Sequence, residues 1–166
     1  MQQNRTSPPN KPSLRLVDSS IWIAFYRAEQ LHILLRLPNI GLSSAVHGEL
    51  KRGKDTLPDQ VAHLVTEEVG HFELDGEDGL RFRMLAVEFG PPDAGQMLHV
   101  KKEWDTCLYM RDSRAAREAA ATGGDVRTWR RLLDDLQEEG ELTEAERERC
   151  EAALKAEFDR SRRRRR

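Results

Sequence analysis

Short apolar runs mark the strands that the chain is expected to form. Leu14–Val17 is the first such run, and Thr106–Met110 is the clearest one late in the chain. Between them, 39–42 is a third candidate, while 69–74 alternates only weakly because Gly70 interrupts it. Short apolar runs bounded by polar or turn residues are typical of strands buried in a parallel sheet. We therefore predict short strands at these positions.

Most of the remaining chain has apolar residues at helical spacing. Ser43 and Ser44 form a cap of small polar residues before one helix, and Thr143 with Glu146 stands at the spacing of a capping box before another. Gly-Pro-Pro at 90–92 breaks the chain. The predicted helices cover 21–26, 44–52, 57–67, 80–89, 93–102, 113–121, 125–139 and 143–158. Strands alternating with helices predict an α/β/α sandwich, with a short, mostly parallel sheet flanked by several helices.

The length of 166 residues suits one domain, which we place at 14–158. Residues 1–13 are rich in Pro, Ser, Asn and Gln, and we expect a disordered leader there. Residues 159–166 form a basic tail. No apolar run approaches the roughly 20 residues that cross a bilayer, so no membrane association is expected.

Charge and cysteine content refine this description. The net charge is −2, but the last five residues are all Arg, so residues 1–161 carry −7. The tail either attracts phosphate or is a solvated extension. Cys107 and Cys150 are 43 residues apart, and neither has a neighbour at metal-ligand spacing. We expect reduced thiols in a cytoplasmic protein.

Four acidic residues stand where a parallel sheet binds its ligands. Asp18 follows the first strand and Asp112 follows the late strand, and ligands bind beyond the carboxyl ends of such strands. Glu49 shares a helix face with Val46, and Asp93 opens the helix after Gly-Pro-Pro. Carboxylates gathered in one cleft need a cation, and Mg²⁺ or Mn²⁺ favours oxygen ligands. The alternative is that the three aspartates only cap helices, which leaves Glu49 unexplained.

Four segments around these acids resemble the signatures of PIN domains. LRLVDSSIWIAFY resembles their first strand and helix, and IGLSSAVHGELKRG is similar to the strand, cap and helix that carry an inward Glu. GPPDAGQML and CLYMRDSRAAREAA resemble the segments of the third and fourth acids. The similarity covers about residues 14–155.

The resemblance implies a PIN-like fold and metal-dependent cleavage of RNA that leaves 5′-phosphate ends. Asp18, Glu49, Asp93 and Asp112 would be the catalytic metal ligands, and Ser20 would hydrogen-bond a ligand or a bound water. One departure concerns the residues before the fourth acid. Many relatives have Thr followed by Asp or Asn there, whereas this chain has Met110 and Arg111. Arg111 would either contact a substrate phosphate or pair with an acid.

Further basic residues are candidates for substrate contacts, or else solvated surface charges. They are Lys51, Arg52 and Lys54 after the Glu49 helix, and Arg114 and Arg117 after Asp112. The expected partners are RNA, an antitoxin protein if the chain is the toxin of a toxin–antitoxin pair, and a second copy of the chain. The apolar stretch 31–35 would be either the contact of that homodimer or internal core.

Two other functions fit the sequence. One is a PIN-fold module that binds RNA or protein without catalysis, which Arg111 favours and the presence of all four acids opposes. The other is an unrelated α/β protein whose aspartates cap helices.

Overall fold

The fold is built on one parallel sheet. A computed structural model describes residues 11–69, 75–111, 113–121 and 123–164. Within them the strands pair in the order β3-β2-β1-β4-β5, and every pairing is parallel. The strands are β1 (Leu14–Val17), β2 (Ile40–Ser43), β3 (Val65–Thr66), β4 (Thr106–Met110) and β5 (Asp125–Thr128). This confirms the predicted fold class, a short parallel sheet flanked by helices.

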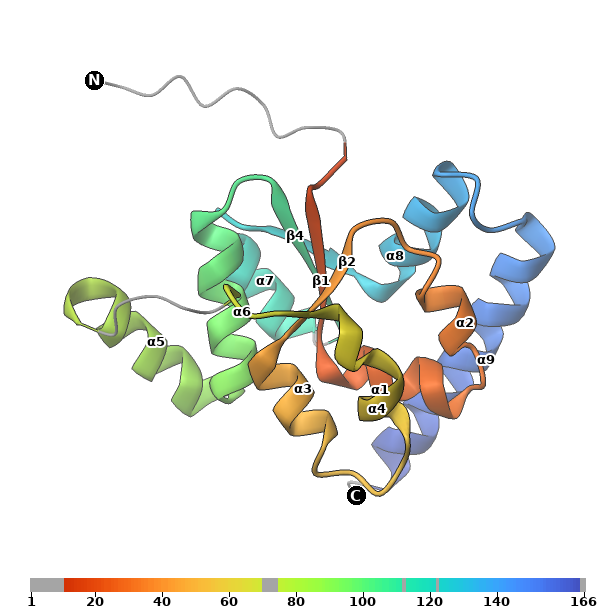
Figure 1. The fold of residues 1–166 in the computed structure, drawn as a ribbon, viewed down its shortest axis with the longest axis horizontal. Helices are drawn as coiled ribbons and strands as arrows, with labels where there is room; N and C mark the ends of the chain where they lie inside the picture. Colours follow the sequence, from red (N-terminus) through yellow and green to blue (C-terminus); the bar gives the residue numbers. More distant parts are fainter. Residues whose placement is uncertain (1–10, 70–74, 112, 122, 165–166) are drawn as a thin grey trace.

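Helices cover both faces of the sheet, as Figure 1 shows. One layer contains α5 (Gly76–Phe89), α6 (Pro91–Lys102) and α7 (Ser113–Ala121). The other layer contains α1 (Ser19–Arg27), α2 (Leu31–Leu34), α3 (Ser44–Leu50), α4 (Leu57–Val61) with the 3₁₀ turn η1 (Ala62–Leu64), α8 (Trp129–Glu138) and α9 (Glu144–Arg163).

Alternate residues of the central strands supply the two cores. Val17 and Tyr109 point into the core under α1, α8 and α9, whereas Leu16 and Leu108 point into the core under α6 and α7. All four side chains are at most 1% exposed. Burial on both faces explains why consecutive residues at the ends of these two strands, and not only alternate ones, are apolar.

Several predicted elements differ from the structure. Residues 125–128, predicted to begin a helix, form β5, because they pair with β4 in the register Cys107↔Asp125. The helix predicted over 57–67 ends early, and Val65–Thr66 forms β3 because it pairs with β2. The predicted strand 69–74 lies largely outside the described residues. At the other end of the chain, α9 continues to Arg163, beyond the predicted limit of 158.

The stretch 31–35 belongs to the interior. Leu31, Ile33 and Leu34 are buried in the core, and only Leu35 keeps a sizeable exposed fraction, 38%. The interpretation of this stretch as internal core is confirmed for Leu31, Ile33 and Leu34, and the homodimer stays a prediction.

Both cysteines are buried free thiols. Burial raises the pKa of Cys107 to about 11 and that of Cys150 to about 12. At neutral pH both are therefore protonated packing residues rather than nucleophiles. None of the helices in the described part of the chain combines the length and apolar character that a bilayer crossing requires.

Candidate functional site

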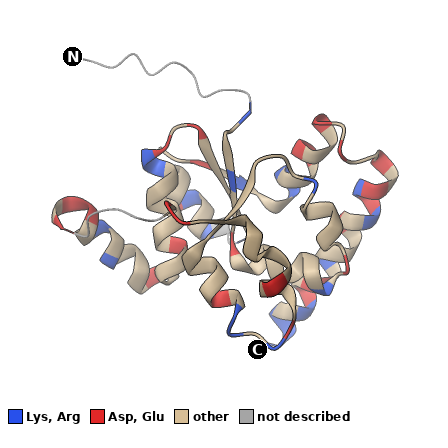
Figure 2. Cartoon of the chain, viewed as in Figure 1, with Lys and Arg blue, Asp and Glu red and all other residues tan. Residues whose placement is uncertain are grey.

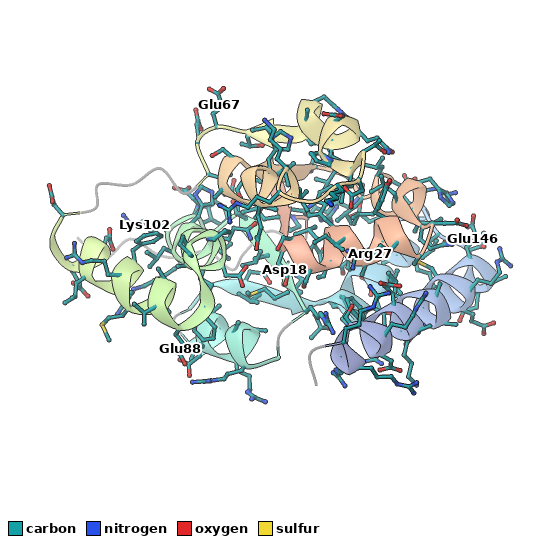
Figure 3. The ribbon with its side chains drawn as sticks, turned by 90° about the horizontal axis from the view of Figure 1, so that it is seen from below. Asp18, Arg27, Glu67, Glu88, Lys102 and Glu146 are labelled. Carbon is teal, nitrogen blue, oxygen red and sulfur yellow. The ribbon has the colours of Figure 1, made fainter. Side chains whose placement is uncertain are left out.

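The sheet reverses its direction of winding between β1 and β4. The chain passes from β1 to β2 on one side, whereas β4 lies on the other side of β1. In open parallel sheets, ligands bind outside the carboxyl ends of the strands at such a reversal. Figure 3 looks onto this edge of the molecule, with Asp18 near its centre. The strands before Asp18 and Asp112, β1 and β4, pair directly with each other.

Asp18 is a buried carboxylate at this point, with 4% of its surface exposed. Its Oδ1 accepts hydrogen bonds from the Ile21 amide at 2.9 Å and the Ser20 hydroxyl at 2.8 Å. Its Oδ2 accepts one from the Arg111 amide at 2.9 Å. The bond from Ile21 makes Asp18 the N-cap of α1. Ser20 thus contacts the first acid, as the sequence predicts.

Burial raises the pKa of Asp18 above its ordinary value of 3.8. Hydrogen bonds from the amides of Arg111 and Ile21 and from Ser20 offset part of that rise, because they stabilise the charged form. The carboxyl group therefore loses its proton less readily than an exposed aspartate. A bound cation would favour the ionised form.

Glu49 and Asp93 lie on helices that pack against each other, α3 and α6. Glu49 is in the last turn of α3 and is half-buried, so its predicted inward orientation is only partly realised. Ser43 caps α3, since its Oγ accepts from the Val46 amide at 3.1 Å.

Asp93 stands in the first turn of α6 and is half-buried. The N-cap of α6 is Gly90, whose φ of +90° suits glycine and allows the sharp turn from α5 into α6. Asp18 is therefore a helix N-cap, as the capping alternative predicts, whereas Asp93 is not. Asp112, the fourth predicted acid, lies outside the described residues.

The donor set suits a hard cation, but the described residues do not complete a site for one. Carboxylate oxygens are the ligands that Mg²⁺ and Mn²⁺ prefer, and Oδ2 of Asp18 accepts a single hydrogen bond from the described residues. However, no three acidic, His or Cys residues within the described ranges lie close enough together to hold a metal ion. Completion of the site would depend on Asp112, or on a shift of Glu49 or Asp93.

Arg111 joins the site to the C-terminal helix. Its guanidinium lies 4.5 Å from the centroid of the Phe158 ring, and its Nη2 donates to the Phe158 carbonyl oxygen at 3.1 Å. The backbone of Arg111 orients Asp18 while its side chain holds α9. The two uses expected from the sequence, a contact with a substrate phosphate or a pair with an acid, stay predictions.

The other predicted substrate contacts are at the surface. Lys51 and Arg52 are exposed in the loop that follows α3, and Arg117 is exposed on α7. Arg114 forms an ion pair with Glu88 of α5, and its guanidinium is 5.9 Å from the Phe89 ring centroid. Arg114 is thus engaged with α5, whereas Lys51, Arg52 and Arg117 present exposed charge.

Two residues whose surroundings stand out in the structure are absent from the sequence-based prediction. Phe158 binds Arg111, and a lone aromatic residue near the end of an amphipathic helix gives no sign of that role. Gln96 lies one turn after Asp93, is 1% exposed, and has no hydrogen-bond partner for its amide among the described residues. The sequence signal that could have indicated a buried polar side chain at Gln96 is its position inside the apolar run 94–98.

The sheet edge beside β4 holds a buried polar network that the sequence also did not reveal. The Tyr109 hydroxyl donates to Oδ2 of Asp135 at 2.6 Å, and Arg127 Nη1 contacts the same oxygen at 2.7 Å. Arg131 pairs with the other oxygen of Asp135 at 2.8 Å. Burial, the Cys107 thiol and the bond to Asp135 raise the pKa of Tyr109. The tyrosine is therefore a permanent donor that fixes α8 on β4.

A hollow of about 690 Å³ lies away from the acids, beside the start of β1 and the end of α6. Its lining includes Thr66, Asp78, His99 and Lys102, and none of the predicted site residues. We place the candidate site at the acids, because the topology of the sheet and the burial of Asp18 both select that edge.

Comparison of the chain with protein-family models, curated proteins and solved structures gives no match.

Proposed function

We propose that the chain is a metal-dependent endoribonuclease of the PIN type, which hydrolyses RNA phosphodiester bonds. The observation that carries the proposal is the position of Asp18, a buried carboxylate at the winding reversal between β1 and β4. Capping alone needs no burial, because an aspartate caps a surface helix equally well. Desolvation of a carboxylate is costly unless a counter-charge is present.

In this proposal Asp18, Glu49, Asp93 and Asp112 are the ligands of Mg²⁺ or Mn²⁺. A divalent ion bound there supplies a deprotonated water and neutralises the charge that develops on the phosphate. The Ser20 hydroxyl and the Arg111 amide hold Asp18 in one orientation. Lys51, Arg52 and Arg117 present exposed charge that suits contact with flanking phosphates.

The resemblance of the four acid segments to PIN domains supports RNA as the substrate. By the same resemblance the chain would act as the toxin of a toxin–antitoxin pair, with an antitoxin protein and a second copy of the chain as partners. The four acids occur at intervals of 31, 44 and 19 residues, in an order that suits a compact domain of this kind.

The test is cleavage of a mixed, end-labelled RNA pool in Mg²⁺ or Mn²⁺. We expect the wild type to produce fragments with 5′-phosphate ends, and Asp18→Asn to produce none while keeping its thermal unfolding transition. The matched control is Asp59→Asn, which removes an exposed acid of α4 and should cleave like the wild type. Equal cleavage by wild type and Asp18→Asn would reject the assignment.

A second function, an inactive PIN-fold module that binds RNA or protein, is supported by two observations. Both oxygens of Asp18 already accept hydrogen bonds, and the acids within the described residues do not form a metal-binding group. Such a module would bind RNA equally well in EDTA and in Mn²⁺ and would cleave none of it.

A further inference from the structure

The two halves of α9 differ in charge balance. In the first half, Arg147 pairs with Asp134 and Glu151, and Glu146 pairs with Arg36. At the other end the chain carries exposed arginines with few acids nearby. Arg160 pairs with Glu157 but is 63% exposed on its side chain. Arg162, Arg163 and Arg164 are exposed, and no carboxylate of the described residues pairs with them.

A chain of contacts ties this basic end to the carboxyl edge of the sheet. Oδ2 of Asp18 accepts from the Arg111 amide at 2.9 Å, and Arg111 Nη2 donates to the Phe158 carbonyl at 3.1 Å. The Phe158 ring also packs against Trp129, with centroids 5.2 Å apart. The exposed arginines follow Phe158 within one to two helical turns, roughly 3–9 Å along the axis. The helix segment that carries them is therefore docked, through Phe158 and Arg111, on the strand end that precedes the Asp18 contact.

A second basic segment lies at the same edge. Lys51, Arg52 and Lys54 are exposed in the loop between α3 and α4. Figure 2 shows Lys and Arg in this loop and in the last turns of α9, both at the lower edge of the molecule. Figure 3, seen from below, has α3 and α9 on opposite sides of Asp18, with α1 between them.

We propose that the C-terminal end of α9, at Arg160 to Arg164, binds the phosphate backbone of single-stranded RNA beside the Asp18 edge, with Arg111 and Phe158 positioning it. The proposal rests on the proposed function for the identity of the ligand. Positive side chains in the last turn of a helix also complement its dipole. One or two positive residues are enough to complement the dipole. The run of arginines is longer than that and continues past the end of the helix, so the dipole alone does not explain it. The acidic remainder of the chain repels phosphate, so binding would concentrate at this edge.

The experiment measures binding of a fluorescent single-stranded RNA 12-mer in EDTA across a series of salt concentrations, so that no cleavage occurs. The test variant changes Arg162, Arg163 and Arg164 to Gln. Each phosphate contact contributes roughly 0.7 to the slope of log K against log salt concentration, so the slope should become shallower by about 2. The corresponding triple Lys variant keeps the charge and should keep the slope.

The matched control changes Lys11, Arg83 and Arg149 to Gln, which alters the net charge equally but at exposed residues elsewhere. An equal loss of slope in the control, or an unchanged slope in the Arg162–164 variant, would overturn the inference. Weakened binding of the Arg162–164 variant to acidic phospholipid vesicles, with its binding to RNA unchanged, would overturn it as well, in favour of a membrane surface. Cleavage by the wild type is measured separately in Mn²⁺, so failure of the nuclease assignment is distinguishable from failure of this contact.

Discussion

The amide of Arg111 donates a hydrogen bond of 2.9 Å to Oδ2 of Asp18, and this bond joins the ends of the two central strands. The same residue uses its side chain to hold Phe158 of α9. The orientation of the candidate catalytic acid and the docking of the last helix therefore depend on one residue. Its backbone and side-chain roles are separable by mutation.

Arg111→Ala keeps the amide but removes the side-chain contacts. We expect the free energy of unfolding to fall by about 1–2 kcal/mol, from loss of a partly buried cation–π contact and a charged hydrogen bond. Urea denaturation measures this change. Arg130→Ala is the control, because Arg130 stacks on Trp129 at 4.6 Å but is 55% exposed. A larger loss in Arg130→Ala than in Arg111→Ala would contradict the described role.

The raised pKa of Asp18 makes the stability of the metal-free protein depend on pH. Between pH 3.8, the ordinary pKa of aspartate, and the higher pKa that Asp18 has in the folded protein, its carboxyl group binds more protons in the folded than in the unfolded chain. Its contribution to the free energy of unfolding therefore falls as pH rises through that window. Asp18→Asn removes this ionisable group. The free energy of unfolding of the variant, minus that of the wild type, should therefore increase as pH rises through the same window. Parallel stability curves from pH 4 to 7, measured in EDTA, would refute this.

The network around Asp135 should be sensitive to which partner is removed. Asp135→Ala leaves Arg127 and Tyr109 without their shared acceptor, and we expect a loss of about 3–5 kcal/mol. Tyr109→Phe keeps both arginine pairs and should cost about 1–3 kcal/mol. The neighbouring Asp134 has a side chain that is 39% exposed and pairs with Arg147, so Asp134→Ala should cost under about 1 kcal/mol. Chemical denaturation of the three variants gives the order, and a reversed order would show that the network is not the main support of α8.

Gln96 offers a test of an unsatisfied buried group. Its amide is 1% exposed and has no partner among the described residues, so replacement by an apolar residue of similar size removes a desolvation cost. Gln96→Leu should raise the free energy of unfolding by about 1 kcal/mol. Gln96→Glu serves as the control with the opposite expected sign, because it places a carboxyl group in the same buried position and should lower the free energy of unfolding. A loss of more than about 1 kcal/mol in Gln96→Leu would show that an ordered water or another group satisfies the amide.

The sequence predicted those features that depend on local pattern. The runs before Asp18 and Asp112 formed strands because both faces of the sheet are covered, and Ser43 and Thr143 capped helices as expected. Strand β5 was missed because Val126 is its one large apolar residue. The extended conformation of these residues therefore depends on pairing with β4, which the local sequence does not indicate. Likewise, the partners of Arg111 lie 47 and 93 residues away in the chain, at Phe158 and Asp18, and no local pattern encodes such contacts.

The most direct test of the central claim is calorimetric titration of Mn²⁺ into the purified protein at neutral pH. If the acids at the carboxyl edge form a divalent-cation site, the wild type binds Mn²⁺, and Asp18→Asn and Glu49→Gln each weaken binding at least about tenfold, roughly 1.4 kcal/mol. Asp59→Asn should bind as the wild type does. Equal affinity in all four proteins, or no binding by the wild type at millimolar Mn²⁺, would contradict the account and leave Asp18 as a helix cap.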